Sequence, residues 1–181
     1  MDILAQVLGI IAMAAIVLSY QCKKKNTLLL IQLVGNVLFA ANMLMLGAYV
    51  GGLLNVIAIG RAIVYMKKEQ IKLPTWVLNA SFIFLYIVSY VLVFTVFGKE
   101  FTVINAILEM LPVIGMTALT FGCAGTNAKA IRLCGLINSP CWLIYNSVSF
   151  SIGGILCEVI SLISLATAMI RLDLKKNKTK A

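Results

Sequence analysis

The sequence predicts an all-α membrane protein whose chain crosses the bilayer seven times, and three observations lead to this prediction. Hydrophobic residues make up 62% of the 181 residues, charged residues make up 12%, and the mean hydropathy is +1.04. A soluble domain of this composition could not keep its surface polar. The apolar residues also fall into segments of about 20 residues, the length of a helix that spans the hydrocarbon core. The polar segments between them are short, and the alternation typical of membrane β-strands is absent.

Seven apolar segments are expected to form the spanning helices. In chain order they cover residues 3–20, 27–46, 49–66, 73–97, 101–121, 130–147 and 150–170. Lipid offers no water to backbone N–H and C=O groups, so helices, which satisfy these groups internally, are the expected spanning structures. A cluster of lysines follows the first segment and does not precede it, so we expect a retained helix and not a cleaved signal peptide.

Lysine and arginine are distributed unequally between the two sets of connections. One set and the carboxyl-terminal tail hold Lys23, Lys24, Lys25, Lys67, Lys68, Lys72, Lys129, Arg132, Arg171, Lys175, Lys176, Lys178 and Lys180. The other set holds Lys99 alone. Because short positive loops stay in the cytoplasm, we predict an amino terminus outside and a carboxyl terminus inside. The net charge of +9 therefore indicates topology and contact with anionic membrane lipids, and nucleic-acid binding is not expected.

The chain contains an apparent duplication of a three-helix unit. Displacing the sequence on itself by 103 residues, without gaps, superposes the first three segments on the last three, so that Gly51 meets Gly154. The fourth segment has no counterpart, and it restores the direction of the chain so that both units point the same way. We therefore expect a first triple-helix bundle at 1–70, a linker helix at 71–99, a second bundle at 100–171 and a basic cytoplasmic tail at 172–181.

This layout of three, one and three helices resembles the SWEET and PQ-loop transporter superfamily. Within it, the segment 46–55, which reads LGAYVGGLLN, and the following Arg61 most resemble the YgjV-type bacterial inner membrane proteins. The resemblance implies two parallel three-helix bundles joined by a linker helix, in the bacterial inner membrane. It also implies transport of a small polar solute by alternating access, without a cofactor and with no settled substrate.

The resemblance further implies where the solute binds. The SWEET pattern places a bulky aromatic residue on the middle helix of each unit and a substrate-contacting asparagine sixteen residues later. In this sequence the spacing gives Phe39 with Asn55 and Trp142 with Glu158, and the two pairs coincide under the displacement of 103. Packing or anchoring at the membrane interface is the alternative for Trp142. Asn138 is a further candidate, although membrane asparagines more often join helices.

A physical argument reaches two of these residues independently. At 1.5 Å per residue, Asn55 and Glu158 lie roughly 10 Å below the outer ends of their helices. An ionised carboxylate there costs about 3 kcal/mol or more unless it is paired or hydrated. Glu158 is therefore expected to face a hydrated cavity or a cation, with a protonated acid in an interhelical hydrogen bond as the alternative.

Arg61 and Glu109 are candidates for gating. Arg61 lies roughly 9 Å deeper than Asn55 on the same helix. We expect its side chain to form a gate or an ion pair with Glu158, and the alternative is snorkelling to the cytoplasmic headgroups. Glu109 lies nearer the outer surface. It is a candidate vestibule residue, and the alternative is a position on a solvated helix face. Pro112 and Pro140 remove backbone hydrogen bonds inside helices and are candidate hinges.

These patterns favour a multi-pass transporter or facilitator of a small polar solute. The alternative is a non-transporting protein that binds lipid or docks a partner on the same fold. An enzyme is not expected, because the chain has no histidine and no Cys-x-x-Cys pair, and therefore neither a histidine-based triad nor a clear metal site. The sequence leaves open whether the chain acts alone or as a homo-oligomer.

Overall fold

A computed structural model describes residues 3–174, and within this range all the regular secondary structure is helical. The helices are α1 (Ile3–Ser19), α2 (Lys25–Met45), α3 (Tyr49–Met66), α4 (Thr75–Thr95), α5 (Val103–Ala124), α6 (Ala128–Val148), α7 (Ile152–Ala168) and the π-helix η1 (Met169–Leu174). The predicted helical class is confirmed, and each observed α-helix begins and ends within a few residues of its expected segment. Most of the expected basic tail, residues 175–181, lies outside the described range.

Five of the helices are long and apolar enough to cross a membrane. These are α2, α3, α4, α5 and α7, the last together with its continuation to Leu172. Helix α1 is apolar but has only 17 residues. Helix α6 has 21 residues but carries several buried polar side chains, among them Arg132, Asn138 and Asn146, which lower its apolar character. The structure therefore supports a protein with several spanning helices.

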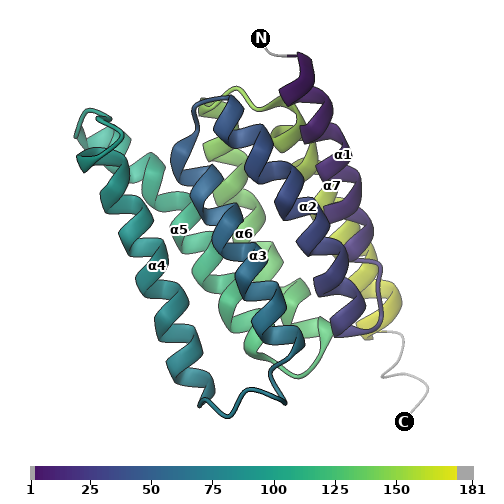
Figure 1. The fold of residues 1–181 in the computed structure, drawn as a ribbon. Coiled ribbons are helices and arrows are strands. Elements are labelled where there is room, and N and C mark those ends of the chain that lie inside the picture. The colour runs from purple at the N-terminus through teal and green to yellow at the C-terminus, as the bar shows by residue number, and fades with distance from the viewer. Residues whose placement is uncertain (1–2, 175–181) are drawn as a thin grey trace.

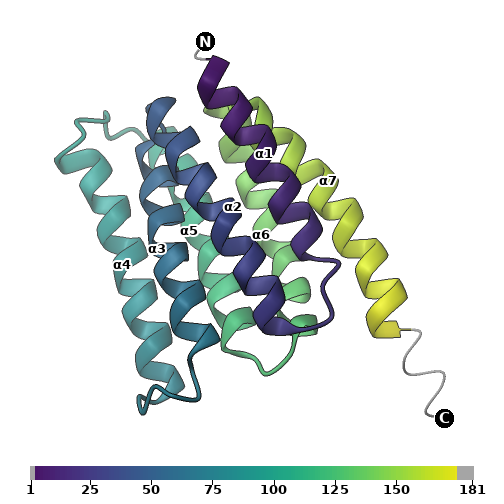
Figure 2. The same cartoon turned by 45° about the vertical axis from the view of Figure 1, so that its right-hand side comes forward.

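Six helices form a closed ring, and α4 lies outside it. Helix α2 packs between α1 and α3, helix α6 packs between α5 and α7, and contacts of α1 with α7 and of α3 with α5 close the ring. Helix α4 packs on the outer side of α3 and α5 (Figures 1 and 2). The outer faces carry exposed apolar side chains such as Phe84, Ile107 and Ile163, which suits contact with lipid.

The two ends of the bundle differ in charge. Helices α1, α3, α5 and α7 begin at one end, at the top of Figure 1, which we call the N-terminal end. The opposite end, which we call the basic end, holds the connections after α1, α3 and α5. Nearly all lysines and arginines of the described residues lie in these connections or on the adjoining helix ends. Lys99 lies in a connection at the N-terminal end.

Glycines allow α1 and α7 to approach until their backbones touch. A Cβ atom added to Gly153 would lie 2.6 Å from the carbonyl carbon of Gly9 and 2.8 Å from its Cα. Small residues permit this close approach between membrane helices, where dispersion contacts replace the hydrophobic effect as the main source of association. The contact fixes the seam between the first and last helices of the ring.

Replacing Gly153 with alanine should separate α1 from α7. The added methyl group would meet backbone atoms that cannot rotate away, and we expect the protein to lose about 1–3 kcal/mol of stability. Thermal unfolding in detergent measures this as a lower midpoint temperature. Gly60→Ala is the matched control, because a Cβ atom at this exposed position on α3 has no atom within 4 Å. Equal midpoints for the two variants would contradict the proposed seam.

Candidate functional site

A cavity inside the ring of six helices is the candidate site. Residues from α1, α2, α3, α5, α6 and α7, with Tyr20 just after α1, line it, and none comes from α4. Its volume, measured as the room for the centres of water-sized molecules, is about 50 Å³, which is enough for a few waters. The polar residues of its lining are Tyr20, Gln32, Asn36, Asn55, Arg61, Asn138, Asn146 and Glu158.

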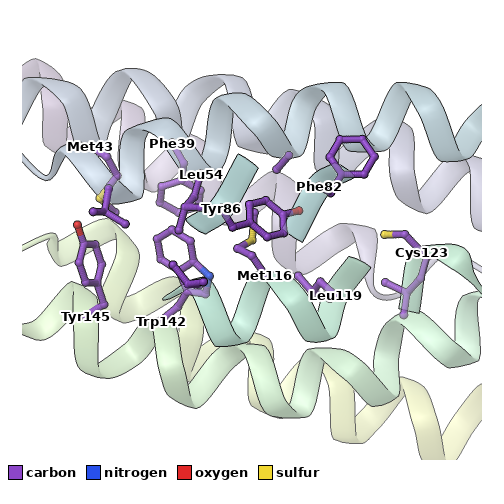
Figure 3. Packing of buried hydrophobic residues seen from close by; sticks show 14 of the residues in the cluster. Phe39, Met43, Leu54, Phe82, Tyr86, Met116, Leu119, Cys123, Trp142 and Tyr145 are labelled. Carbon is purple, nitrogen blue, oxygen red and sulfur yellow. The ribbon is translucent and has the colours of Figure 1, made fainter. Parts of the chain in front are cut away.

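All five substrate-binding candidates line this one cavity. Phe39 on α2 and Trp142 on α6 are buried and point toward one another from opposite sides (Figure 3). Asn55 and Asn138 are buried, and Glu158 is half-buried. Trp142 is thus inside the ring and is not an interfacial anchor. The structure brings the five side chains together, while their role in binding stays a prediction.

Residues that coincide under the displacement of 103 lie on the same cavity. Four such pairs line it, namely Ile16 with Leu119, Phe39 with Trp142, Met43 with Asn146, and Asn55 with Glu158. Each partner comes from the corresponding helix of the other half, since α1, α2 and α3 match α5, α6 and α7. The two halves therefore present corresponding faces to the cavity.

Matching hydrogen bonds join the halves at the N-terminal end. Asn42 on α2 and Tyr145 on α6 coincide under the displacement of 103. The Ser151 hydroxyl, at the start of α7, donates to Asn42 Oδ1 at 3.2 Å, and the Gly51 N–H, in the first turn of α3, donates to the Tyr145 hydroxyl at 3.1 Å. All four residues are buried. Each middle helix is thus bonded to the third helix of the opposite half at this end.

A second set of matching bonds lies toward the basic end. Lys68 Nζ donates to the Ala124 carbonyl at 2.9 Å, and Arg171 Nη2 donates to Gln21 Oε1 at 2.7 Å. Lys68 corresponds to Arg171, and Gln21 corresponds to Ala124, under the same displacement. Both bonds run from the end of a third helix to the end of the first helix of the opposite half. The correspondence between the halves therefore extends along the bundle.

Arg61 is buried and joins α3 to α4 and α5. It is 3% exposed, and its Nη1 donates to the Tyr86 hydroxyl at 3.1 Å, the Met116 carbonyl at 3.1 Å and the Thr120 hydroxyl at 3.4 Å. Tyr86 and Thr120 also share a hydrogen bond of 2.9 Å. The side chain lines the cavity and does not snorkel to the surface, so that alternative is wrong.

The expected ion pair between Arg61 and Glu158 does not form in this structure. Arg61 forms no ion pair with any side chain of residues 3–172, and the ion pair between Lys99 and Glu109 lies elsewhere. The reason is geometric, because the hydroxyl and carbonyl acceptors on α4 and α5 lie next to Arg61 and hold its Nη1. Both side chains nevertheless line the same cavity.

Glu109 lies apart from the central cavity. It is 3% exposed and pairs with Lys99, so it does not lie on a solvated helix face. Together with Tyr49, Phe97 and Tyr145 it lines a second pocket at the N-terminal end, which fits the expected vestibule. Its other carboxylate oxygen, Oε2, has no hydrogen-bond partner. Tyr145 lines this pocket and also accepts a hydrogen bond from the Gly51 N–H.

The two proline candidates lie within continuous helices. Pro112 is inside α5 and is buried, whereas Pro140 is inside α6 and is exposed. Neither residue has a backbone N–H to donate, so each interrupts the hydrogen-bond pattern of its helix. Their role as hinges stays a prediction. In the described part of the chain, no cluster of three or more His, Cys, Asp or Glu side chains offers a metal site.

The sequence also held a signal for cavity residues that the reasoning from spacing missed. Gln32, Asn36, Phe39 and Met43 follow one another at intervals of four, three and four residues, which is one face of a helix. All four line the cavity. A stripe of polar and large side chains within an apolar helix therefore identifies the face that turns away from lipid.

The bond between Tyr86 and Arg61 should stabilise the docking of α4 on the ring. Tyr86→Phe removes one acceptor of the buried Arg61 guanidinium and one partner of the Thr120 hydroxyl, and we expect a loss of about 1–3 kcal/mol. Thermal unfolding in detergent measures the effect. Tyr90→Phe is the matched control on the same helix, since its hydroxyl makes only a long bond of 3.4 Å to the Ala106 carbonyl. If both variants unfold together with the unchanged protein, Tyr86 does not hold α4.

One family of known proteins matches nearly the whole chain. The sequence model of the Imp-YgjV family, described as bacterial inner membrane protein, matches residues 3–176. No curated protein and no solved structure matches significantly. Together with five helices that are long and apolar enough to span a bilayer, the match indicates a multi-pass location in the inner membrane. The chain belongs to the Imp-YgjV family of bacterial inner membrane proteins.

Proposed function

We propose that this protein transports a small polar solute across the inner membrane by alternating access. The central cavity is the observation that carries this proposal. Polar side chains from both halves, including Asn55 and Glu158, gather around one cavity inside helices whose outer faces are apolar. Polar groups inside a membrane bundle are costly unless they find partners, so their convergence on one cavity favours a polar ligand over a purely structural role. A polar solute bound in the cavity would supply hydrogen-bond partners to these groups.

The proposal includes a SWEET-like fold of two parallel halves joined by α4. The order of helices around the ring, α1, α2, α3, α5, α6 and α7, stays the same when each half is exchanged for the other. The matching cavity pairs and the matching bonds at both ends are further support. In transporters with parallel repeats, the solute passes between the halves near the middle of the membrane. The cavity is lined by helices of both proposed halves, which supports such a route.

The proposed orientation puts the basic end in the cytoplasm. Short loops rich in lysine and arginine remain on the cytoplasmic side of bacterial inner membranes. The N-terminal end would then face outward, and Lys99 and Glu109 would lie in an outer vestibule. Alternating access would require the bonds of Asn42 and Tyr145 to break and re-form, with Pro112 and Pro140 as the hinges.

Uptake into liposomes tests the function directly. Protein reconstituted into liposomes should raise the uptake of at least one solute from a panel of sugars, polyols, amino acids and vitamins. Glu158→Gln should lower that uptake by about tenfold or more, because the variant loses a charged hydrogen-bond acceptor inside the cavity. Glu100→Gln is the control, since Glu100 is exposed outside the helices.

Two outcomes would count against transport. If folded wild-type protein and Glu158→Gln both stay at the rate of empty liposomes for every solute, the proposal loses its support. Crosslinking in native membranes that recovers one stoichiometric partner would then favour a protein that docks a partner on the same fold.

Labelling of Cys157 tests the proposed outer gate. Cys157 is buried and lines the cavity, and in a variant without the other four cysteines it reports access from outside. Tyr145→Phe removes the acceptor of the Gly51 N–H, so a membrane-impermeant maleimide added outside should react about twofold to tenfold faster. Tyr90→Phe, whose hydroxyl lies away from the cavity, should leave the rate unchanged. Equal rates for all three proteins would exclude Tyr145 from the gate.

A further inference from the structure

Arg61 is a buried cation that the protein surrounds with neutral groups. Its acceptors are a phenol, a backbone carbonyl and a hydroxyl. No carboxylate of residues 3–172 forms an ion pair within 4.0 Å of its guanidinium group. A charged group inside a membrane protein is strongly unfavourable unless an opposite charge or water compensates it. The position of Arg61 on the central cavity therefore suits a solute that brings an anionic group.

The guanidinium keeps donors free for such a group. Its hydrogen bonds to residues 3–172 all use Nη1, so Nη2 and Nε are not engaged by this part of the chain. The planar guanidinium can donate two parallel N–H bonds to the oxygens of one carboxylate. The three bonds of Nη1 meanwhile hold the side chain in place, so binding would require little further ordering.

Glu158 places the opposite charge on the same cavity. It is the only other formally charged residue of the lining, and it lies on α7, across the ring from α3. The neighbouring helix α6 adds Asn138 and Asn146, whose buried side-chain oxygens have no hydrogen-bond partner. This wall therefore offers acceptors, whereas Arg61 offers donors. Arg61 lies twelve residues after the start of α3 and Glu158 six after the start of α7, so their levels differ by roughly 9 Å.

We propose that the solute is a small zwitterion of the amino-acid type. This inference rests on the transport function proposed above and names its substrate class. The carboxylate of the solute binds Arg61, and its ammonium group binds Glu158 and the amide oxygens beside it. A neutral sugar would leave both protein charges uncompensated, and a simple anion or cation would compensate only one. Because the two charges lie at different levels, zwitterions with separated charges should fit better than α-amino acids.

Uptake of matched solutes into proteoliposomes tests this assignment. The probes are L-alanine, β-alanine, 4-aminobutanoate and 6-aminohexanoate, each with its carboxamide twin, which lacks the anion, and its N-acetyl twin, which lacks the cation. Glucose and glycerol are the neutral references. Wild-type protein should take up at least one zwitterion, and both of its twins should enter about tenfold more slowly or worse.

Variants connect each solute group to one side chain. Arg61→Gln should lower zwitterion uptake by about tenfold and remove the preference over the carboxamide twin, while the preference over the N-acetyl twin persists. Glu158→Gln should also lower zwitterion uptake, but it should remove the preference over the N-acetyl twin while the preference over the carboxamide twin persists. Arg61→Lys keeps the charge and should retain part of the uptake. Arg132→Gln is the matched control, because Arg132 is also a buried arginine but does not line the cavity, so the preferences among solutes should stay unchanged.

The outcomes separate this inference from the transport function. If wild-type protein moves glucose, glycerol or the twins as fast as every zwitterion, the substrate class is wrong while transport stands. Zwitterion uptake that Arg61→Gln leaves intact also overturns it. If folded protein takes up none of these probes, the inference fails. The proposed transport function fails only when the wider solute panel also shows no uptake above empty liposomes.

Discussion

A polar side chain on a helix in lipid must find its partners inside the protein, and the structure depends on this constraint. Water is absent from the hydrocarbon core, so an unpaired amide or charge facing lipid would cost several times the thermal energy. The ring of six helices turns its polar stripes inward, toward a common cavity, and leaves apolar side chains outside. Helix α4 contributes nothing to the cavity and packs on the outside through apolar residues and the Tyr86 hydroxyl.

The correspondence between the halves gives the bundle two ends that are held in the same way. Residues 103 positions apart make matching bonds across the ring, from Asn42 and Tyr145 at one end and from Lys68 and Arg171 at the other. The bonds at the N-terminal end join neutral groups and contribute only about 1 kcal/mol each, whereas those of Lys68 and Arg171 are charge-assisted and roughly twice as strong. Under the proposed transport function, one set would have to open while the other holds.

The buried charged side chains differ in whether an opposite charge pairs with them. Glu109 lies near the N-terminal end and is compensated by Lys99 from the adjacent connection. Arg61 and Glu158 lie deeper, share one cavity and are not paired with each other. A direct ion pair would neutralise both side chains. Two separated, opposite charges can instead each bind an oppositely charged group of a ligand and so fix its orientation. The same separation explains why Arg61 is fixed by neutral acceptors on α4 and α5.

The sequence by itself determined the helical class, the segments that become helices and the five side chains that meet in the cavity. Hydropathy and helix periodicity are local properties, whereas Phe39 and Trp142 followed from the resemblance to the SWEET pattern, whose spacing recurs in both halves of the duplication. Only the tertiary structure decided the partners of Arg61, the bonds of Asn42 and Tyr145 across the halves, and the contact of Gly9 with Gly153. These features depend on which helices are neighbours and how each is rotated about its axis. Hydropathy does not encode either property, because every helix in lipid is apolar on most of its surface.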